Sequence, residues 1–149
     1  MFEIRVEKTI AAAHRLYNYA GPCESLHGHN YRIEIAYTGT ELDSFGMLAD
    51  FTDIKRAFNV VLDTIDHTYL NELPGFEGIS PSAENIAKYI YQGLKKTTFE
   101  RATLSHVSVW ETPTQVAVYK RVNDEAPKRL KAKQRTKSFQ PGGGGVKPD

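Results

Sequence analysis

Three histidines and one cysteine near the N-terminus have the residue types and the spacing of a metal-dependent active site. His27 and His29 lie two residues apart, so in an extended strand they point to the same face. Gly28 between them has no side chain that would obstruct a close approach to the backbone. With His14 as a third imidazole, the set matches the three ligands and one open position of a catalytic zinc site. Cys23, four residues before His27, can then act beside the metal as a reactive thiolate.

A His-Gly-His triplet also occurs in turns, where the histidines are ordinary polar residues, so the triplet alone does not define a metal site. The third histidine and the single cysteine favour a metal, because clusters of cysteine and histidine in a reducing compartment more often signal metal binding or catalysis than disulfides. Three histidines suit several divalent ions. The sequence therefore predicts Zn²⁺ and leaves other metals open.

The composition indicates one cytoplasmic domain. A length of 149 residues suits a single domain with a hydrophobic core. The single cysteine excludes an internal disulfide and fits a reducing compartment. No segment approaches the roughly 18 apolar residues that a membrane helix needs. Residues 1–5 alternate apolar and charged side chains, which indicates a strand and not a signal peptide.

Alternating apolar and polar residues predict four strands, over residues 2–14, 29–38, about 106–110 and about 116–119. The first two strands pair as a hairpin, and the long loop between them, residues 15–26, carries the cysteine. Two helices come between the second and third strands, which gives the order β-β-α-α-β-β. This order predicts an α+β fold with both helices on one face of an antiparallel four-stranded sheet.

The two helices are recognised by their capping residues and by apolar residues at helical spacing. The first begins at Asp50 or Thr52, either of which can cap it. Its apolar residues, which we expect in the core, are Phe51, Ile54, Phe58, Leu62 and Ile65. The second begins at Ser80-Pro81, with proline in the first helical position.

The C-terminal end differs in composition from the rest of the chain. Residues 126–149 hold seven Lys or Arg and one acid, which leaves a net charge of −5 on the first 125 residues. Few apolar residues and a run of four glycines predict a disordered tail over residues 124–149, after a folded domain over residues 1–123. The tail is either a solvated appendage or a basic arm that tethers nucleic acid.

Residues spread along the chain resemble the motifs of the 6-pyruvoyltetrahydropterin synthase family, which includes the 6-carboxytetrahydropterin synthases of the queuosine pathway. The resemblance covers residues 2 to about 121 without large gaps, and its motif residues are His14, Cys23, His27, Gly28, His29, Asp66, His67, Trp110, Glu111 and Thr112. It implies the tunnelling fold (T-fold), whose protomers join their sheets into a barrel as trimers or hexamers. Active sites then lie between protomers, and open sheet edges find partners.

The resemblance also implies a role for each motif residue. The three histidines would bind zinc, which polarises a developing carbonyl of 7,8-dihydroneopterin triphosphate. Cys23 would be the general base, with Asp66 and His67 completing a relay. Glu111 would anchor the pterin ring through two parallel hydrogen bonds, assisted by Thr112 and Ser82. Structural roles stay open for Asp66, at a helix end, and for Glu111, before a proline.

The product is less well defined than the family. The three residues between Cys23 and His27 resemble the spacing in short bacterial enzymes that form 6-carboxy-5,6,7,8-tetrahydropterin, and we predict that product. A 6-pyruvoyl product is the alternative. Glu24 resembles the glutamate of a subgroup that cleaves the side chain to 6-hydroxymethyl-7,8-dihydropterin for folate synthesis, or else it faces solvent. A pterin- or RNA-binding relative without turnover is the non-enzyme alternative, although the complete motif set argues against it.

Overall fold

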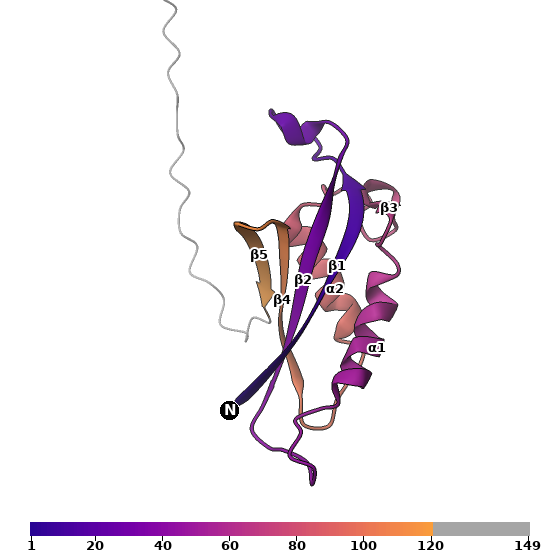
Figure 1. Ribbon diagram of the computed structural model, residues 1–149. Coiled ribbons are helices and arrows are strands. Elements are labelled where there is room, and N and C mark those ends of the chain that lie inside the picture. Colours follow the sequence, from indigo (N-terminus) through magenta and orange to yellow (C-terminus); the bar gives the residue numbers. More distant parts are fainter. Residues whose placement is uncertain (121–149) are drawn as a thin grey trace, which may run out of the picture.

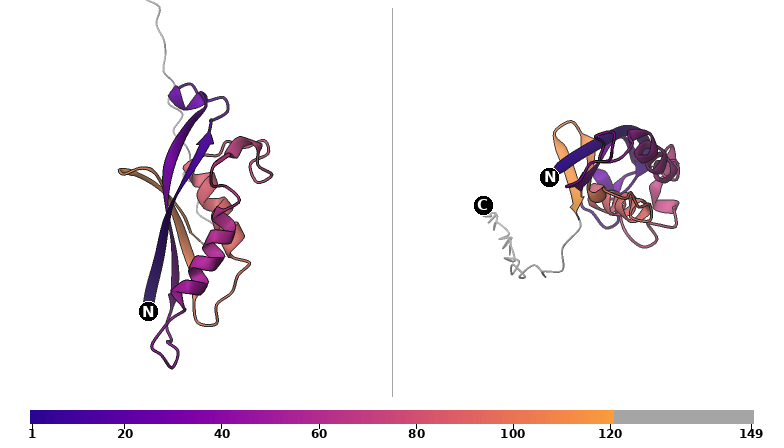
Figure 2. Two further views of the ribbon diagram at one scale, coloured as in Figure 1. Left: turned by 45° about the vertical axis from the view of Figure 1, so that its right-hand side comes forward. Right: turned by 90° about the horizontal axis from the view of Figure 1, so that it is seen from below.

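The computed structural model describes residues 1–120, which form a mixed sheet with two helices on one face (Figures 1 and 2). The predicted tail and the predicted domain end at residue 123 lie outside the described residues. The elements in chain order are β1 (Phe2–His14), the 3₁₀ turn η1 (Pro22–Glu24), β2 (His27–Gly39), α1 (Phe51–Leu62), β3 (Thr68–Tyr69), the 3₁₀ turn η2 (Leu70–Glu72), α2 (Ala83–Leu94), β4 (Thr103–Thr112) and β5 (Gln115–Lys120). No helix in this part of the chain is long and apolar enough to cross a membrane.

The sheet has five strands in the order β3-β1-β2-β4-β5. β1 and β2 pair antiparallel along their whole length, from Phe2 opposite Gly39 to His14 opposite His27. β3 pairs parallel to β1 over two residues only. The prediction of four antiparallel strands was therefore wrong in this detail, because a two-residue strand has no periodicity that a sequence could reveal.

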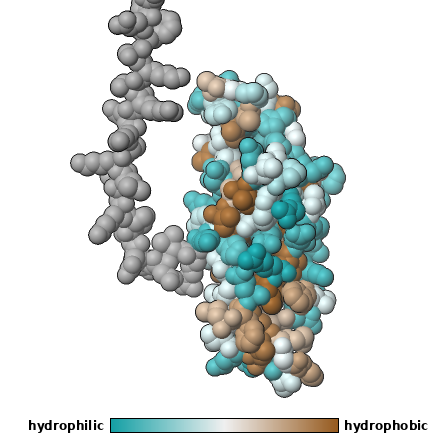
Figure 3. All heavy atoms as spheres, turned by 60° about the vertical axis from the view of Figure 1, so that its left-hand side comes forward, coloured by the Kyte–Doolittle hydropathy of each residue, from teal (hydrophilic) through white to brown (hydrophobic). Residues whose placement is uncertain are grey.

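The core lies between the sheet and the helices. One face of β2 is fully covered by apolar residues of the two helices. The buried set includes Tyr31, Ile33, Ile35, Tyr37, Ile54, Phe58, Leu62, Ile86, Ile90 and Leu94. The opposite face of the sheet carries charged side chains such as Arg5 and Arg32. On the side shown in Figure 3, hydrophobic residues gather towards the lower end, where the connection between β2 and α1 lies in Figure 1.

The helix boundaries confirm part of the prediction. Asp50 caps α1 by accepting a hydrogen bond from the Thr52 amide at 2.7 Å. Phe51 is 47% exposed and does not pack in the core, contrary to expectation. Ile65 is fully buried, but it lies beyond the last helical residue, so it reaches the core from a turn.

The start of α2 was predicted two residues too early. Ser82 is the cap, because its hydroxyl accepts a hydrogen bond from the Asn85 amide, and the helix begins at Ala83. Ser80 instead accepts a hydrogen bond from the Tyr17 amide at 2.8 Å. Pro81 therefore precedes the cap and does not occupy the first helical position.

Two edges of the sheet are open within residues 1–120. β3 reaches only as far as the end of β1, so residues 2–10 of β1 have no strand on that side. β5 is the last strand on the opposite side. Unpaired edges of this length are commonly closed by another chain.

Candidate active site

The three predicted metal ligands come together where β1 ends and β2 begins. His14 is the last residue of β1 and lies opposite His27, the first residue of β2, while His29 follows on the same face. One ligand nitrogen from each ring lies within 4.8 Å of the others. The hairpin register thus produces the cluster that the sequence predicted.

The hydrogen bonds of two rings leave the Nε2 atoms free for a metal. Nδ1 of His14 donates to the Pro81 carbonyl at 2.7 Å, and Nδ1 of His27 donates to the Ser25 carbonyl at 2.7 Å. The two Nε2 atoms then face each other at 3.0 Å as lone pairs. A cation between them removes that repulsion, and carbonyl partners of this kind orient metal-binding histidines in general.

His29 supplies a second sign that a metal fits. Its Nε2 atom is buried and has no hydrogen-bond partner among residues 1–120. A buried polar atom without a partner is costly, and an ion that binds it removes the cost. The residues present therefore suit a divalent ion, whose identity the geometry leaves open.

Burial keeps His14 in the form that binds metals. The ring is 1% exposed, and burial lowers its pKa more than the hydrogen bond to the Pro81 carbonyl raises it. The positive charge that His27 can carry lowers the pKa further. His14 is therefore neutral at neutral pH, as a ligand must be.

A cavity of about 310 Å³ lies next to the histidines and gathers several predicted site residues. Cys23 of η1, Ser82 before α2 and Glu111 of β4 all line it. Oε1 of Glu111 is 4.0 Å from Nε2 of His14, which connects the cavity with the metal ligands. A thiol and a carboxylate thus share one cavity, and the carboxylate connects it with the histidine cluster.

Ser82 and Thr112, which were predicted to assist Glu111, also have local structural roles. The Ser82 hydroxyl caps α2, although the residue also lines the cavity. The Thr112 hydroxyl lies 3.4 Å from that of Thr114 and 3.5 Å from Oε1 of Gln115, and Thr112 is not a lining residue. Glu24 follows Cys23 in η1, but its side chain is exposed and it does not line the cavity.

Asp66 and His67 lie elsewhere in the chain's fold, at the open edge beside β1. Oδ1 of Asp66 accepts hydrogen bonds from the Ala11 amide at 3.0 Å and from His67 Nδ1 at 2.9 Å. Burial raises the pKa of Asp66, but these hydrogen bonds outweigh it, so the pKa is lowered overall. His67 adopts a left-handed backbone conformation with φ of 55°, and its side chain is 81% exposed.

The structure does not place His67 and Cys23 in one cavity. His67 lines a separate hollow of about 490 Å³ with Ala13, Gly28 and His29. Cys23 lines the hollow beside Glu111. Within one chain, the predicted relay from Cys23 to His67 is therefore incomplete.

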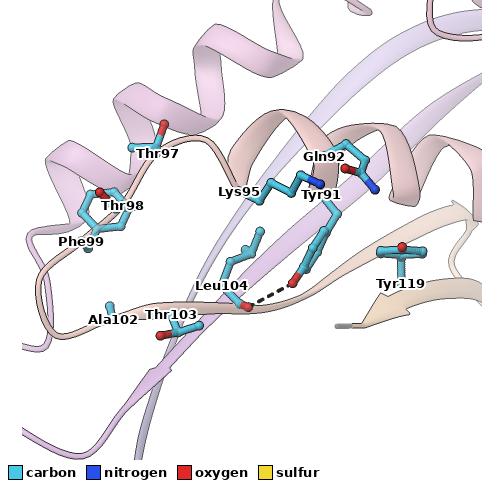
Figure 4. A pocket seen from close by; sticks show the side chains of 10 residues that line it. All are labelled: Tyr91, Gln92, Lys95, Thr97, Thr98, Phe99, Ala102, Thr103, Leu104 and Tyr119. Atoms are coloured by element: carbon cyan, nitrogen blue, oxygen red, sulfur yellow. Dashed lines mark hydrogen bonds between the residues drawn. The ribbon is translucent and has the colours of Figure 1, made fainter. Parts of the chain in front are cut away.

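A third cavity, at the end of α2, has no comparable chemistry. It measures about 610 Å³, and Lys95, Tyr91 and Tyr119 are among its ten lining residues (Figure 4). None of the ten is a histidine, a cysteine or a carboxylate. It can neither bind a metal in the manner of the histidine cluster nor support acid–base chemistry by a carboxylate or imidazole.

Sequence reasoning missed three residues around the site. Glu84 lines the cavity beside Glu111, and its place in the first turn of α2 gave no signal. Asn71 is a buried polar residue that holds the backbone after His14. Tyr31 follows His29 by two residues on the same strand, but a tyrosine in an alternating strand is no sign of a site. Burial, and then the charges of Glu111 and Cys23, raise its pKa well above the ordinary value.

A comparison with known families settles the relationship that the motifs suggested. The model of the 6-pyruvoyl tetrahydropterin synthase family matches residues 3–122. The chain belongs to this family. The 6-pyruvoyl tetrahydropterin synthase family consists of lyases, so the chain is an enzyme of that class.

Relatives in this family carry two different names. The 6-carboxy-5,6,7,8-tetrahydropterin synthase of Bacillus subtilis is 35% identical over 127 residues, covering 80% of this chain and 85% of that enzyme. The Haemophilus influenzae enzyme of the same name is 30% identical and matches over 99% of its length and 80% of this chain. The structure of Caenorhabditis elegans 6-pyruvoyl tetrahydropterin synthase superposes with a TM-score of 0.74 at 30% identity, covering 81% of this chain and 96% of that one.

Proposed function

We propose that this enzyme binds zinc and converts 7,8-dihydroneopterin triphosphate to 6-carboxy-5,6,7,8-tetrahydropterin for the queuosine pathway. The observation that carries the proposal is the cluster of three histidines beside a cavity that holds Cys23 and Glu111. The names of the relatives from Bacillus subtilis and Haemophilus influenzae support the 6-carboxy product. The single cysteine in the chain supports a cytoplasmic location.

The roles that we propose for the site follow from chemistry and placement. His14, His27 and His29 would hold zinc, which when bound acts as a Lewis acid on the oxygens of the substrate side chain. Glu111 would accept two hydrogen bonds from the pterin ring, because a carboxylate offers two oxygens in the required geometry. Ser82 lines the same cavity and would contact the substrate, with Thr112 supporting the strand end beside Glu111.

Cys23 would be the base that removes a proton from the substrate carbon. A thiol has a pKa of about 8.5 and becomes an effective base at neutral pH only near positive charge. The metal and a protonated imidazole would supply that charge. His67 is suited to the second task, because the Asp66 carboxylate lies 2.9 Å from its Nδ1 atom and orients the ring.

We also propose that a second copy of the chain completes each site. Strand directions alternate from β1 through β2 and β4 to β5, so β1 of one copy can pair antiparallel with β5 of the next. His67 lies at the β1 edge, whereas the cavity with Cys23 is lined by Gln115 and Val116 of β5. Joining these edges in a ring brings the two hollows together and closes a trimer, or a hexamer of two trimers.

The first experiment is a product assay. The zinc-loaded protein is incubated with 7,8-dihydroneopterin triphosphate, and the pterin product is identified by mass spectrometry, with Cys23→Ala as the control that should keep zinc and lose turnover. A 6-carboxy product together with acetaldehyde supports the proposal. A 6-pyruvoyl product would support the alternative that matches the name of the Caenorhabditis elegans relative.

Glu24 defines the remaining enzyme alternative. A 6-hydroxymethyl product that disappears in Glu24→Gln would assign the base to Glu24 and the enzyme to folate synthesis. No product at all, together with salt-sensitive RNA binding that is lost when the chain is cut after residue 123, would favour the binding protein. We propose instead that residues 1–123 are the catalytic domain and that residues 124–149 can be removed without loss of turnover.

A further inference from the structure

Three buried side-chain atoms have no hydrogen-bond partner among the described residues: Nε2 of His29 and the hydroxyls of Tyr31 and Tyr37. Such atoms are rare in folded proteins, and each one needs an explanation. A metal accounts for His29. The position of Tyr31 suggests why its hydroxyl has no partner, whereas the position of Tyr37 suggests no such reason.

Tyr31 lies next to the proposed metal ligands of the candidate active site. Its ring centroid lies 5.8 Å from that of His14 and 5.3 Å from that of His29, both in edge-to-face geometry. The last pair between β2 and β4 sets Arg32 opposite Trp110, and Tyr31 and Glu111 are the residues next to this pair on the two strands. Both side chains lie beside the ring of His14.

The carboxylate of Glu111 has unfilled hydrogen-bond acceptor positions. Within residues 1–120 its carboxylate accepts no hydrogen bond, and Nε2 of His14 lies 4.0 Å from it. Of the charges that act on the Tyr31 phenol, that of Glu111 is the strongest. An ionised carboxylate has about four acceptor positions, and a pterin ring would fill only two of them.

We propose that the Tyr31 hydroxyl donates a hydrogen bond to the Glu111 carboxylate when a pterin occupies the cavity, so that Tyr31 is the positioning residue of the pterin anchor. The inference rests on the proposed role of Glu111. A neutral phenol serves this purpose because it donates one hydrogen bond without adding a charge that would compete with the metal. The bond would hold the carboxylate in the plane that the two donors of the ring require.

Tyr37 provides a matched control on the same strand. It is 1% exposed, it faces the same side of β2, and its hydroxyl is also unpartnered. Its ring packs against Phe99 at 5.2 Å, six residues or roughly 20 Å along the strand from Tyr31. Tyr31→Phe and Tyr37→Phe therefore remove the same group from equally buried places.

The test compares the two variants in the full-length, zinc-loaded enzyme. Neopterin fluorescence gives the Kd for the ring, steady-state kinetics with 7,8-dihydroneopterin triphosphate give kcat and KM, and metal analysis gives the zinc content. Tyr31→Phe should raise Kd and KM by about tenfold or more, since the lost bond is to a charged group, and should change kcat by less than about twofold. Tyr37→Phe should change all three constants by less than about twofold.

Equal values for the two variants in an active enzyme would overturn the inference and leave the proposed function intact. Loss of zinc in Tyr31→Phe would also overturn it, because the phenol would then act through the histidines. If the unmodified enzyme neither binds neopterin nor converts the substrate, the proposed function itself fails, and the role of Tyr31 fails with it.

Discussion

Replacing Asn71 by alanine should destabilise the domain and loosen the metal site together. Asn71 lies in η2 and is 9% exposed. Its Oδ1 atom accepts a hydrogen bond from the Arg15 amide at 2.9 Å, and its Nδ2 atom donates to the Arg15 carbonyl at 3.0 Å. The side chain thus extends, two residues further along both segments, the pairing that β3 makes with the end of β1.

The expected loss follows from these two bonds. Each is worth about 1 kcal/mol net, and leaving a partly buried backbone group without a partner costs about 1–3 kcal/mol. Allowing for some access of water to Arg15, we expect Asn71→Ala to lower the free energy of unfolding by about 2–4 kcal/mol. For a domain of this size, that corresponds to a decrease in Tm of roughly 10 °C.

The same change should weaken metal binding, because Arg15 directly follows His14. The next residue, Leu16, donates from its amide to the Cys23 carbonyl at 2.8 Å. Asn71 therefore holds the segment that connects His14, a proposed metal ligand, to the thiol of Cys23. Losing such support typically costs about tenfold or more in metal affinity.

Urea unfolding of the metal-free protein at fixed protomer concentration measures the first effect, and competition for zinc with a chelator measures the second. Asn59→Asp is the control: Oδ1 of Asn59 accepts a hydrogen bond from Nζ of Lys8 at 2.9 Å at an exposed position, so this change should cost less than about 0.5 kcal/mol. Asn71→Asp should destabilise, because a carboxylate cannot donate to the Arg15 carbonyl. An Asn71→Ala variant that unfolds and binds zinc like the unmodified protein would refute the reasoning.

Other predictions concern the metal, the relay and its pH dependence. Removal of the metal should lower Tm in a scanning calorimeter by several degrees. The metal-free protein should lose stability as the pH falls below 6.5, because burial lowers the pKa of His14 and protons then favour the unfolded chain. Urea titrations at about pH 7.5 and about pH 5.5 measure this loss. Cys23→Ala and His67→Asn should each abolish turnover, and subunits of the two variants that are unfolded and refolded together should recover part of it; no recovery would argue against shared sites. The pKa of Asp66 is lowered in the folded protein, so the ionised carboxylate stabilises the fold above pH 3.8, and this contribution disappears on further acidification. In thermal unfolding, Asp66→Asn should therefore be less stable than the unmodified protein at neutral pH and equally stable at low pH.

Local patterns predicted the larger elements well. The alternation in β1 and β2 and the helical spacing of Ile54 and Phe58 reflect burial of one face, which a sequence records directly. Features that depend on a few atoms were missed or misplaced. The cap of α2 moved to Ser82 because the Ser80 hydroxyl bonds to the Tyr17 amide, a contact over 63 residues that no local pattern contains.

The sequence by itself determined the chemistry of the site. The types and order of His14, Cys23, His27 and His29 predict imidazole ligands for a metal beside a thiol, whatever the surrounding fold. The tertiary structure alone decided which groups meet. The hairpin register sets His14 against His27, and the placement of β4 beside β2 brings Glu111 to 4.0 Å from Nε2 of His14. The parallel pairing of β3 with β1 leaves His67 at an open edge, away from Cys23. Strand pairing joins residues far apart in the chain through backbone hydrogen bonds that carry no side-chain signature, so distances of this kind exist only once the chain has folded.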